Sequence, residues 1–130
     1  MNATRRTLTL LGVVFVLIGL VGFAAPDLMG MHLTVAHNLV HLISGALALY
    51  FGVKGTVQSA RTFATVFGVT YGLLGVIGLI AGTGPDRMLT VIPDQLMFGT
   101  ADSVIHLILG AVFLVAGLAK TTIAAAPPLR

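Results

Sequence analysis

Residues 33–53 read LTVAHNLVHLISGALALYFGV and decide the fold of this chain. The stretch contains no Asp, Glu, Lys or Arg. A helix needs about 20 mostly apolar residues to cross a bilayer, and this stretch has that length. His37 and His41 interrupt it one helical turn apart. Ionisable side chains inside a membrane span are costly and commonly functional. The stretch therefore predicts a transmembrane helix with a candidate site on one face.

The rest of the chain has the same apolar character. Hydrophobic residues make up 57% of it and charged residues 8%, and the mean hydropathy is +1.05, whereas soluble domains are roughly half apolar and a quarter charged. Three further stretches are long enough to span a membrane, at about Leu8 to Ala25, Phe63 to Ala81 and Phe98 to Ala119. The expected fold is an all-α membrane protein, a four-transmembrane-helix bundle in which residues 1–130 form one domain.

An internal repeat divides these four spans into two pairs. Residues 12–22 in the first span align without gaps on residues 68–78 in the third. The second span aligns on the fourth through Ala36/Ala101, His41/His106, Gly45/Gly110, Ala46/Ala111 and Gly52/Gly117. The sequence thus predicts two tandem helical hairpins, at about 7–53 and 63–119, with a short tail at 120–130. A repeat of two spans is a parallel repeat about an axis along the membrane normal, so His41 and His106 should face each other at similar depth.

Helical spacing indicates which faces of the spans meet. The stripe on the second span is His37, His41, Gly45, Ala48 and Gly52, and the matching stripe on the fourth is Asp102, His106, Gly110 and Gly117. Small residues let membrane helices approach closely, and polar residues can bond across their interface. Both stripes are therefore expected to point into the bundle. The residues expected to mediate helix packing are Gly45, Gly68, Gly72, Gly75 and Gly110.

The basic residues predict the orientation in the membrane. They lie mainly before the first span, between the second and third, and after the fourth, at Arg5, Arg6, Lys54, Arg61, Lys120 and Arg130. The other two connections hold only Arg87. By the positive-inside rule, both termini are expected in the cytoplasm. All Asp and His residues then belong to the outer side. Because the basic residues are scattered among helix ends, a nucleic-acid partner is not expected; the expected partners are the bilayer and a homo-oligomer or larger membrane complex.

The connection between the third and fourth spans, residues 83–97, is long for a hairpin loop. It contains Met88, Leu89, Val91 and Ile92, and it is interrupted by Pro85 and Pro93. This mixture predicts a segment that rests on the membrane interface or covers the mouth of the bundle.

Two short segments carry a family resemblance. Residues 38–45, NLVHLISG, and 103–110, SVIHLILG, together with the glycine-rich span that follows Ala60-Arg61, resemble a bacterial family of four-helix membrane proteins, the domain of unknown function 4383. That family is typically written with an Asn-x-x-His pattern in both halves. Asn38 matches the pattern, and Ser103 departs from it. The resemblance implies the four-helix fold and a bacterial inner-membrane location, and it implies no activity.

A metal site is one interpretation of the polar residues. His37, His41 and His106 would supply nitrogen ligands and Asp102 an oxygen, because i, i+4 pairs on facing helices can converge on one ion. Zinc suits three histidines and one carboxylate. Copper is favoured by Met29, Met31, Met88 and Met97, all expected on the outer side, since thioethers suit Cu(I).

Three other interpretations stay open. The histidines can be structural, with each ring bonding to Ser44, Ser103, Asn38, Asp102 or a backbone carbonyl. His41 and His106 can be the axial ligands of a haem b whose ring enters a slot beside the glycines one turn below, although only Arg87 is available for its propionates. The His/Asp cluster can also move protons or small ions.

Enzymatic function is not expected. The chain has no Glu and no Cys, and it lacks a nucleophile elbow, a phosphate-binding loop and an HExxH motif. The sequence favours a small non-enzymatic membrane protein with an outward-facing His/Asp cluster inside the bundle, for which binding of zinc or copper is one candidate role. The alternative is an accessory or scaffolding subunit of a larger membrane complex, in which the same residues are purely structural.

Overall fold

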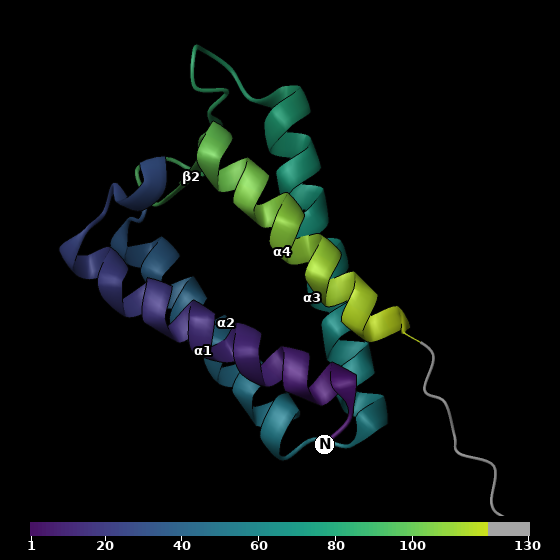
Figure 1. Ribbon diagram of the computed structural model, residues 1–130. Helices are drawn as coiled ribbons and strands as arrows, with labels where there is room; N and C mark the ends of the chain where they lie inside the picture. The colour runs from purple at the N-terminus through teal and green to yellow at the C-terminus, as the bar shows by residue number, and fades with distance from the viewer. Residues whose placement is uncertain (120–130) are drawn as a thin grey trace, which may run out of the picture.

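The computed structural model describes residues 1–119, and four long helices account for most of them (Figure 1). They are α1 (Ala3–Ala24), α2 (Val35–Val53), α3 (Val57–Ala81) and α4 (Thr100–Leu118). Each is long and apolar enough to cross a membrane, which confirms the expected four-helix membrane bundle. The tail expected at 120–130 lies outside the described residues.

Side-chain caps set where the helices begin. The side chains of Asn2, Thr34 and Thr56 accept bonds from backbone N–H groups in the first turns of α1, α2 and α3. Such caps satisfy donors that a helix start leaves free. For this reason α1 and α3 begin several residues before Leu8 and Phe63, where the apolar runs alone would start them. Their first turns are polar extensions of the spans.

Within each hairpin the two helices approach through glycine. A methyl group placed on Gly12 of α1 would lie 2.9 Å from the carbonyl oxygen of Gly45 of α2, and one on Gly45 would lie 2.9 Å from that of Gly12. The corresponding separations between Gly68 of α3 and Gly110 of α4 are 3.1 and 3.0 Å. Helix backbones pack this closely only where side chains are absent. Hairpin one (α1 and α2) and hairpin two (α3 and α4) are therefore built on the same contact.

An arginine joins the two helices of each hairpin at the end opposite its loop. Arg5 Nε donates to the carbonyl oxygen of Gly52 at 3.0 Å, and Arg61 Nε donates to that of Gly117, also at 3.0 Å. These carbonyls belong to the last turns of α2 and α4, where the helix has no backbone N–H group left to donate to them. We call this the arginine end of the molecule and the opposite one the loop end.

Aromatic rings join the two hairpins. Phe15 of α1 lies 5.3 Å from Tyr71 of α3 and 5.9 Å from Phe113 of α4, measured between ring centroids. Near the arginine end, Thr4 Oγ1 donates to the carbonyl oxygen of Ala116 at 2.8 Å. The core of buried residues that includes these rings therefore runs between the hairpins rather than within either one.

Short irregular elements cover the loop end. A 3₁₀ turn, η1 (Leu28–Gly30), follows α1. The connection between α3 and α4 contains two antiparallel strands, β1 (Leu89–Ile92) and β2 (Leu96–Phe98). This β-hairpin was not predicted. The fourth span, expected from about Phe98, begins two residues later at Thr100, because Phe98 ends β2 and pairs with Leu89. The Thr34 hydroxyl donates to the carbonyl oxygen of Gln95, so the connection contacts hairpin one and helps to close this end.

Candidate functional site

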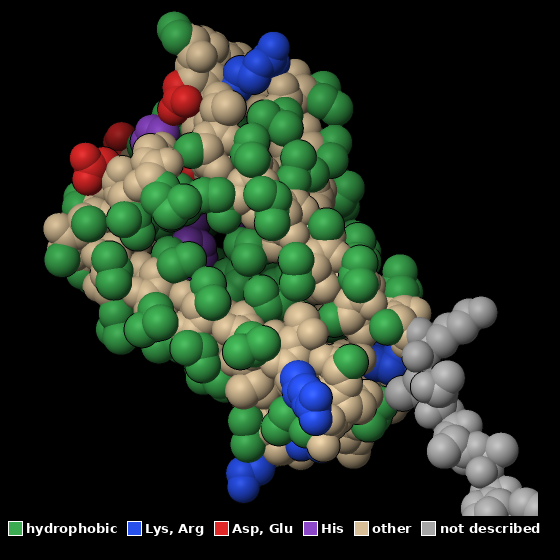
Figure 2. Space-filling model, in the orientation of Figure 1, with side chains coloured by type: hydrophobic (Ala, Val, Ile, Leu, Met, Phe, Trp, Pro, Cys, Tyr) green, Lys and Arg blue, Asp and Glu red, His purple; other side chains and the backbone are tan. Residues whose placement is uncertain are grey.

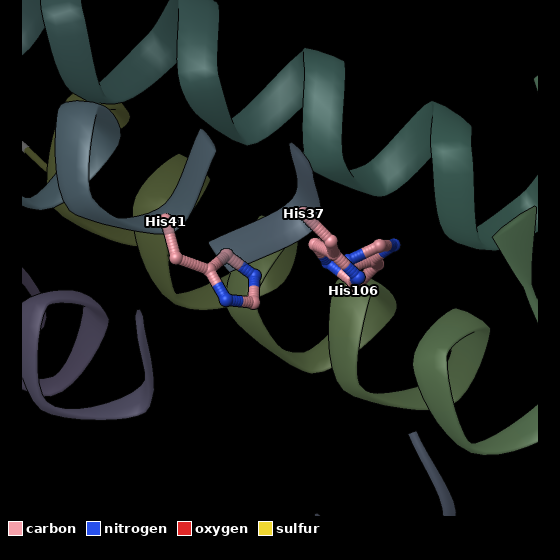
Figure 3. A group of neighbouring side chains, drawn as sticks. All are labelled: His37, His41 and His106. Carbon is pink, nitrogen blue, oxygen red and sulfur yellow. The ribbon is translucent and has the colours of Figure 1, made fainter. Parts of the chain in front are cut away.

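Three of the four expected metal ligands meet between the hairpins. His37 and His41 project from α2 and His106 from α4, with the His41 ring directed toward the other two (Figure 3). One ligand nitrogen of each residue can be chosen so that all three lie within 4.8 Å of one another. None of the three side chains is more than 3% exposed. The inner stripes of α2 and α4 therefore bring together a buried group of three imidazoles, which we call the histidine group.

The protonation of His37 follows from its partner. Its Nδ1 lies 2.9 Å from the carbonyl oxygen of His32. Because a carbonyl oxygen only accepts, the His37 Nδ1 carries the hydrogen and donates it, which leaves the lone pair on Nε2. Metal-binding histidines are commonly oriented in this way by a bond from their second nitrogen. His37 is thus prepared to offer Nε2 to a ligand.

His41 and His106 each bury a nitrogen without a partner. Among the described residues, no hydrogen-bond partner contacts Nδ1 of either ring, and both atoms are removed from solvent. A buried polar atom without a partner is destabilising and calls for an explanation. Nitrogen lone pairs are what Zn²⁺ and Cu ions bind. The residues present therefore fit a metal ion.

Aromatic residues pack against the histidine group. Phe15 contacts His41 edge-on at 5.4 Å between centroids, and Tyr71 contacts His106 in the same way at 5.4 Å. Phe98, from β2, lies 4.9 Å from the His106 ring. Phe15 and Tyr71 hold aligned positions in the two halves of the sequence. The environment is apolar, so any charge placed there is strongly felt by its neighbours.

Asp102, the fourth expected ligand, does not join the histidine group. Its fully buried carboxylate accepts from His32 Nδ1 at 2.8 Å, from the His32 backbone N–H at 3.1 Å and from the Gly99 N–H at 2.9 Å. The His32 carbonyl in turn accepts from His37. Asp102 is therefore linked to the histidine group through His32, which sequence reasoning did not single out. The fold of the turn at 28–31 brings His32 there, and no local sequence pattern signals it.

The packing around the glycines bears on the haem interpretation. A methyl group on Gly45 would lie 2.8 Å from the Val16 side chain, and one on Gly110 would lie 2.5 Å from the Gly72 nitrogen. Gly68 and Gly75 are crowded by α4 in a similar way, whereas a methyl group on Gly72 would meet nothing within 4 Å. The opposite helix already fills the space beside Gly45 and Gly110. Among residues 1–119, the interfaces of the paired helices therefore leave no slot for a haem ring beside Gly45 or Gly110.

The fold and the histidine group define a four-helix membrane protein with a buried polar centre. The family model for the domain of unknown function DUF4383 matches residues 5–119. The chain therefore belongs to this family, as its sequence predicted. No characterised protein and no solved structure matches the chain.

Proposed function

We propose that this protein binds one transition-metal ion, zinc or copper, through His37, His41 and His106. The observation that carries the proposal is the convergence of three imidazole nitrogens within 4.8 Å in a buried site, where two of the rings hold a nitrogen without a protein partner. Imidazole is a good ligand for both metals. Three protein ligands leave one coordination position for a further group.

The buried carboxylate of Asp102 supports this assignment. A metal cation in an apolar environment needs a negative charge nearby. Asp102 carries this charge and does not itself contact the ion. It is connected to the histidine group by two hydrogen bonds, from His32 to Asp102 and from His37 to the His32 carbonyl. Outer partners of this kind orient the ligating ring and raise its basicity. We assign Asp102 a positioning role and not a ligating one.

The purely structural interpretation has less support. It requires each ring to bond with a neighbouring side chain or carbonyl. His37 has such a bond, but His41 and His106 have none at Nδ1 among the described residues. The nearby Ser44 hydroxyl is paired with Tyr71 instead. A scaffolding role for the histidines would leave these nitrogens unexplained. We further propose that the function is non-enzymatic, because the Ser44 and Tyr71 hydroxyls beside the histidine group bond to each other, and neither bonds to an imidazole among the described residues.

Metal content in variants tests the proposal. Purified protein in detergent is incubated with Zn²⁺ or Cu⁺, desalted and analysed by elemental analysis. We expect one ion per chain in the original protein and loss of most of it in His41→Ala, in His106→Ala and in the double variant. The control is Leu47→Ala on the exposed face of α2, which should retain the ion, whereas His32→Ala, which removes the ring bond to Asp102, should weaken its binding.

A failure to bind metal would contradict the proposal. Protein that takes up no ion before any mutation, and whose single variants lose stability additively, would overturn the metal proposal and favour structural histidines. Interhelical hydrogen bonds in membranes contribute only about 0.6 kcal/mol on average. On the structural interpretation each single substitution should therefore be mild.

We also propose that the two hairpins are copies of one unit, inserted in the same sense in a bacterial inner membrane. Equivalent residues make equivalent contacts, such as Arg5 with Gly52 and Arg61 with Gly117. Basic side chains gather mainly at the arginine end and acidic ones at the loop end, with a hydrophobic band between them (Figure 2). By the positive-inside rule the arginine end, with the N-terminus, is cytoplasmic.

Cysteine labelling tests this orientation, because the chain contains no cysteine of its own. Single cysteines at Asn2, Val57 and Thr90 are exposed to a membrane-impermeant thiol reagent in whole cells. We expect labelling at position 90 alone. Labelling at 2 and 57 but not at 90 would reverse the orientation, and labelling that differs between 2 and 57 would contradict a parallel repeat.

A further inference from the structure

A cavity of about 230 Å³ lies between α2 and α3, beside the histidine group. Its wall includes His37 and His106 but not His41. Two other wall residues, Val40 and Thr70, are exposed on the outer surface of the helices. The cavity therefore reaches the face that lies against lipid, and Figure 2 shows a histidine side chain within a hollow bordered by hydrophobic ones. A molecule dissolved in the bilayer can enter from the side.

The size and the walls of the cavity select a flat ring. Phe67, Tyr71 and Phe98 supply aromatic surface, in addition to the two imidazoles. An apolar cavity of about 150 Å³ holds benzene. The larger volume here has room for one six-membered ring with substituents. Aromatic rings pack well against such walls, edge-on or offset.

The polar atoms of the cavity supply hydrogen-bond donors. Ser44 Oγ and Tyr71 Oη lie 3.2 Å apart and share one hydrogen bond. The pair has two hydroxyl hydrogens, and this bond uses one of them. The other can be donated to a ligand oxygen. The site therefore complements an uncharged acceptor such as a ring carbonyl.

We propose that this cavity binds the ring of a lipid-soluble quinone, with the isoprenoid tail leaving past Val40 and Thr70 into the bilayer. A quinone combines the features that the site requires: a planar six-membered ring, carbonyl oxygens that only accept, no charge, and delivery from lipid. The proposal concerns binding alone. It goes beyond the metal site: His37 and His106 line the cavity as well, whereas His41 does not, and the quinone is expected to bind the metal-free protein.

Tyrosine fluorescence provides a direct test. The chain has no Trp and only two Tyr, so Tyr50→Phe leaves Tyr71 as the single fluorophore. Metal-free protein, prepared with a chelator and placed in phosphatidylcholine nanodiscs, is titrated with decylubiquinone. We expect saturable quenching of at least half of the Tyr71 emission. The Tyr71→Phe protein reports from Tyr50, which is 59% exposed on the outer surface of α2, and should show only weak, non-saturating quenching.

Two further variants, made in the Tyr50→Phe background, locate the binding. Ser44→Leu fills the cavity and removes the hydroxyl pair, so at least tenfold more quinone should be needed for half quenching. Ala46→Leu adds similar bulk to the exposed face of the same helix and should have no effect. Circular dichroism checks that both variants remain helical. Equal, non-saturating quenching of Tyr50 and Tyr71 would overturn the proposal. Unchanged quenching in a folded Ser44→Leu protein would also overturn it.

His41→Ala separates this proposal from the metal site. The variant should lose the ion and keep the saturable quenching of Tyr71. Quenching without metal uptake in the original protein would reject only the metal proposal. Metal uptake without saturable quenching would reject only the quinone proposal. If the quenching disappeared in His41→Ala, quinone binding would require His41, which would contradict binding by the residues of the cavity wall alone.

Discussion

Hairpin one and hairpin two hold their helices together through the same contacts but differ at buried positions near the loop end. The glycine contacts and the arginine bonds recur in both. In contrast, Phe15 aligns with Tyr71, His37 with Asp102, and Asn38 with Ser103. The recurring positions set the packing of the helices. The differing positions give the bundle centre its chemistry, and the comparison shows that the two requirements are met by separate residues of the same helices.

The difference makes the centre asymmetric. Hairpin one supplies two members of the histidine group, and hairpin two supplies one. Only hairpin two supplies a tyrosine hydroxyl, which bonds across to Ser44 of hairpin one. The buried carboxylate of hairpin two bonds to His32 of the turn that precedes α2. Neither hairpin alone could form the site.

The largest effects should come from breaking the shared packing. Gly45→Ala and Gly110→Ala each bring a methyl group against backbone atoms of the partner helix, at distances as short as 2.9 and 2.5 Å. Overpacking of this kind costs about 1–3 kcal/mol, and the loss should be similar in the two hairpins. Unfolding in mixed micelles with increasing dodecyl sulfate, followed by circular dichroism, measures it.

Gly72→Ala is the matched control for these two variants. A methyl group there meets nothing within 4 Å, and alanine favours a helix more than glycine does. This variant should be as stable as the original protein or slightly more so. If Gly45→Ala proved as harmless as Gly72→Ala, the close packing of hairpin one would be disproved.

Smaller and unequal effects are expected where the hairpins differ. Asn38 Nδ2 donates to the carbonyl oxygen of Leu33 at 3.3 Å, whereas the Ser103 side chain makes no hydrogen bond; Asn38 Oδ1 and Ser103 Oγ both lack a partner among the described residues. Asn38→Ala should therefore lose about 0.5–1 kcal/mol of unfolding free energy. Ser103→Ala should change it by less than about 0.5 kcal/mol, because it removes an unsatisfied group. The same unfolding assay compares them, and equal losses would mean that the two positions are energetically equivalent.

Much of the fold could be predicted because membrane spans are signalled by length and hydrophobicity. The inner stripes were also predictable, since His37, His41 and Gly45 on α2 are all buried as their spacing indicated. The β-hairpin was not predictable, because its strands have only four and three residues, too few to give a clear alternation. Membrane helices follow from composition, whereas short connections depend on local turns.

The position of Asp102 shows where the repeat misleads. Its alignment with His37 predicted a shared site, but the helix start gave the carboxylate other partners. As the third residue of α4, Asp102 accepts from the Gly99 N–H. A turn with positive φ angles at Met29 and Gly30 then leads the chain to His32 above it. The alignment of the two halves gives the position of a residue along its helix. The hydrogen-bond partner of that residue depends on which loop packs beside it.

The arginine bonds have a consequence for the order in which the protein is made. Arg5 bonds to Gly52 and Val53, so hairpin one can close as soon as the ribosome has produced the end of α2, before hairpin two exists. Arg61 and Gly117 repeat the event for hairpin two. A hairpin inserted in the reverse sense would have to carry its arginine through the lipid, at a cost of about 2.5–3.5 kcal/mol at the bilayer centre. In the proposed orientation, the arginine that directs insertion is also the one that completes each hairpin, so correct insertion and correct pairing would be selected together during synthesis.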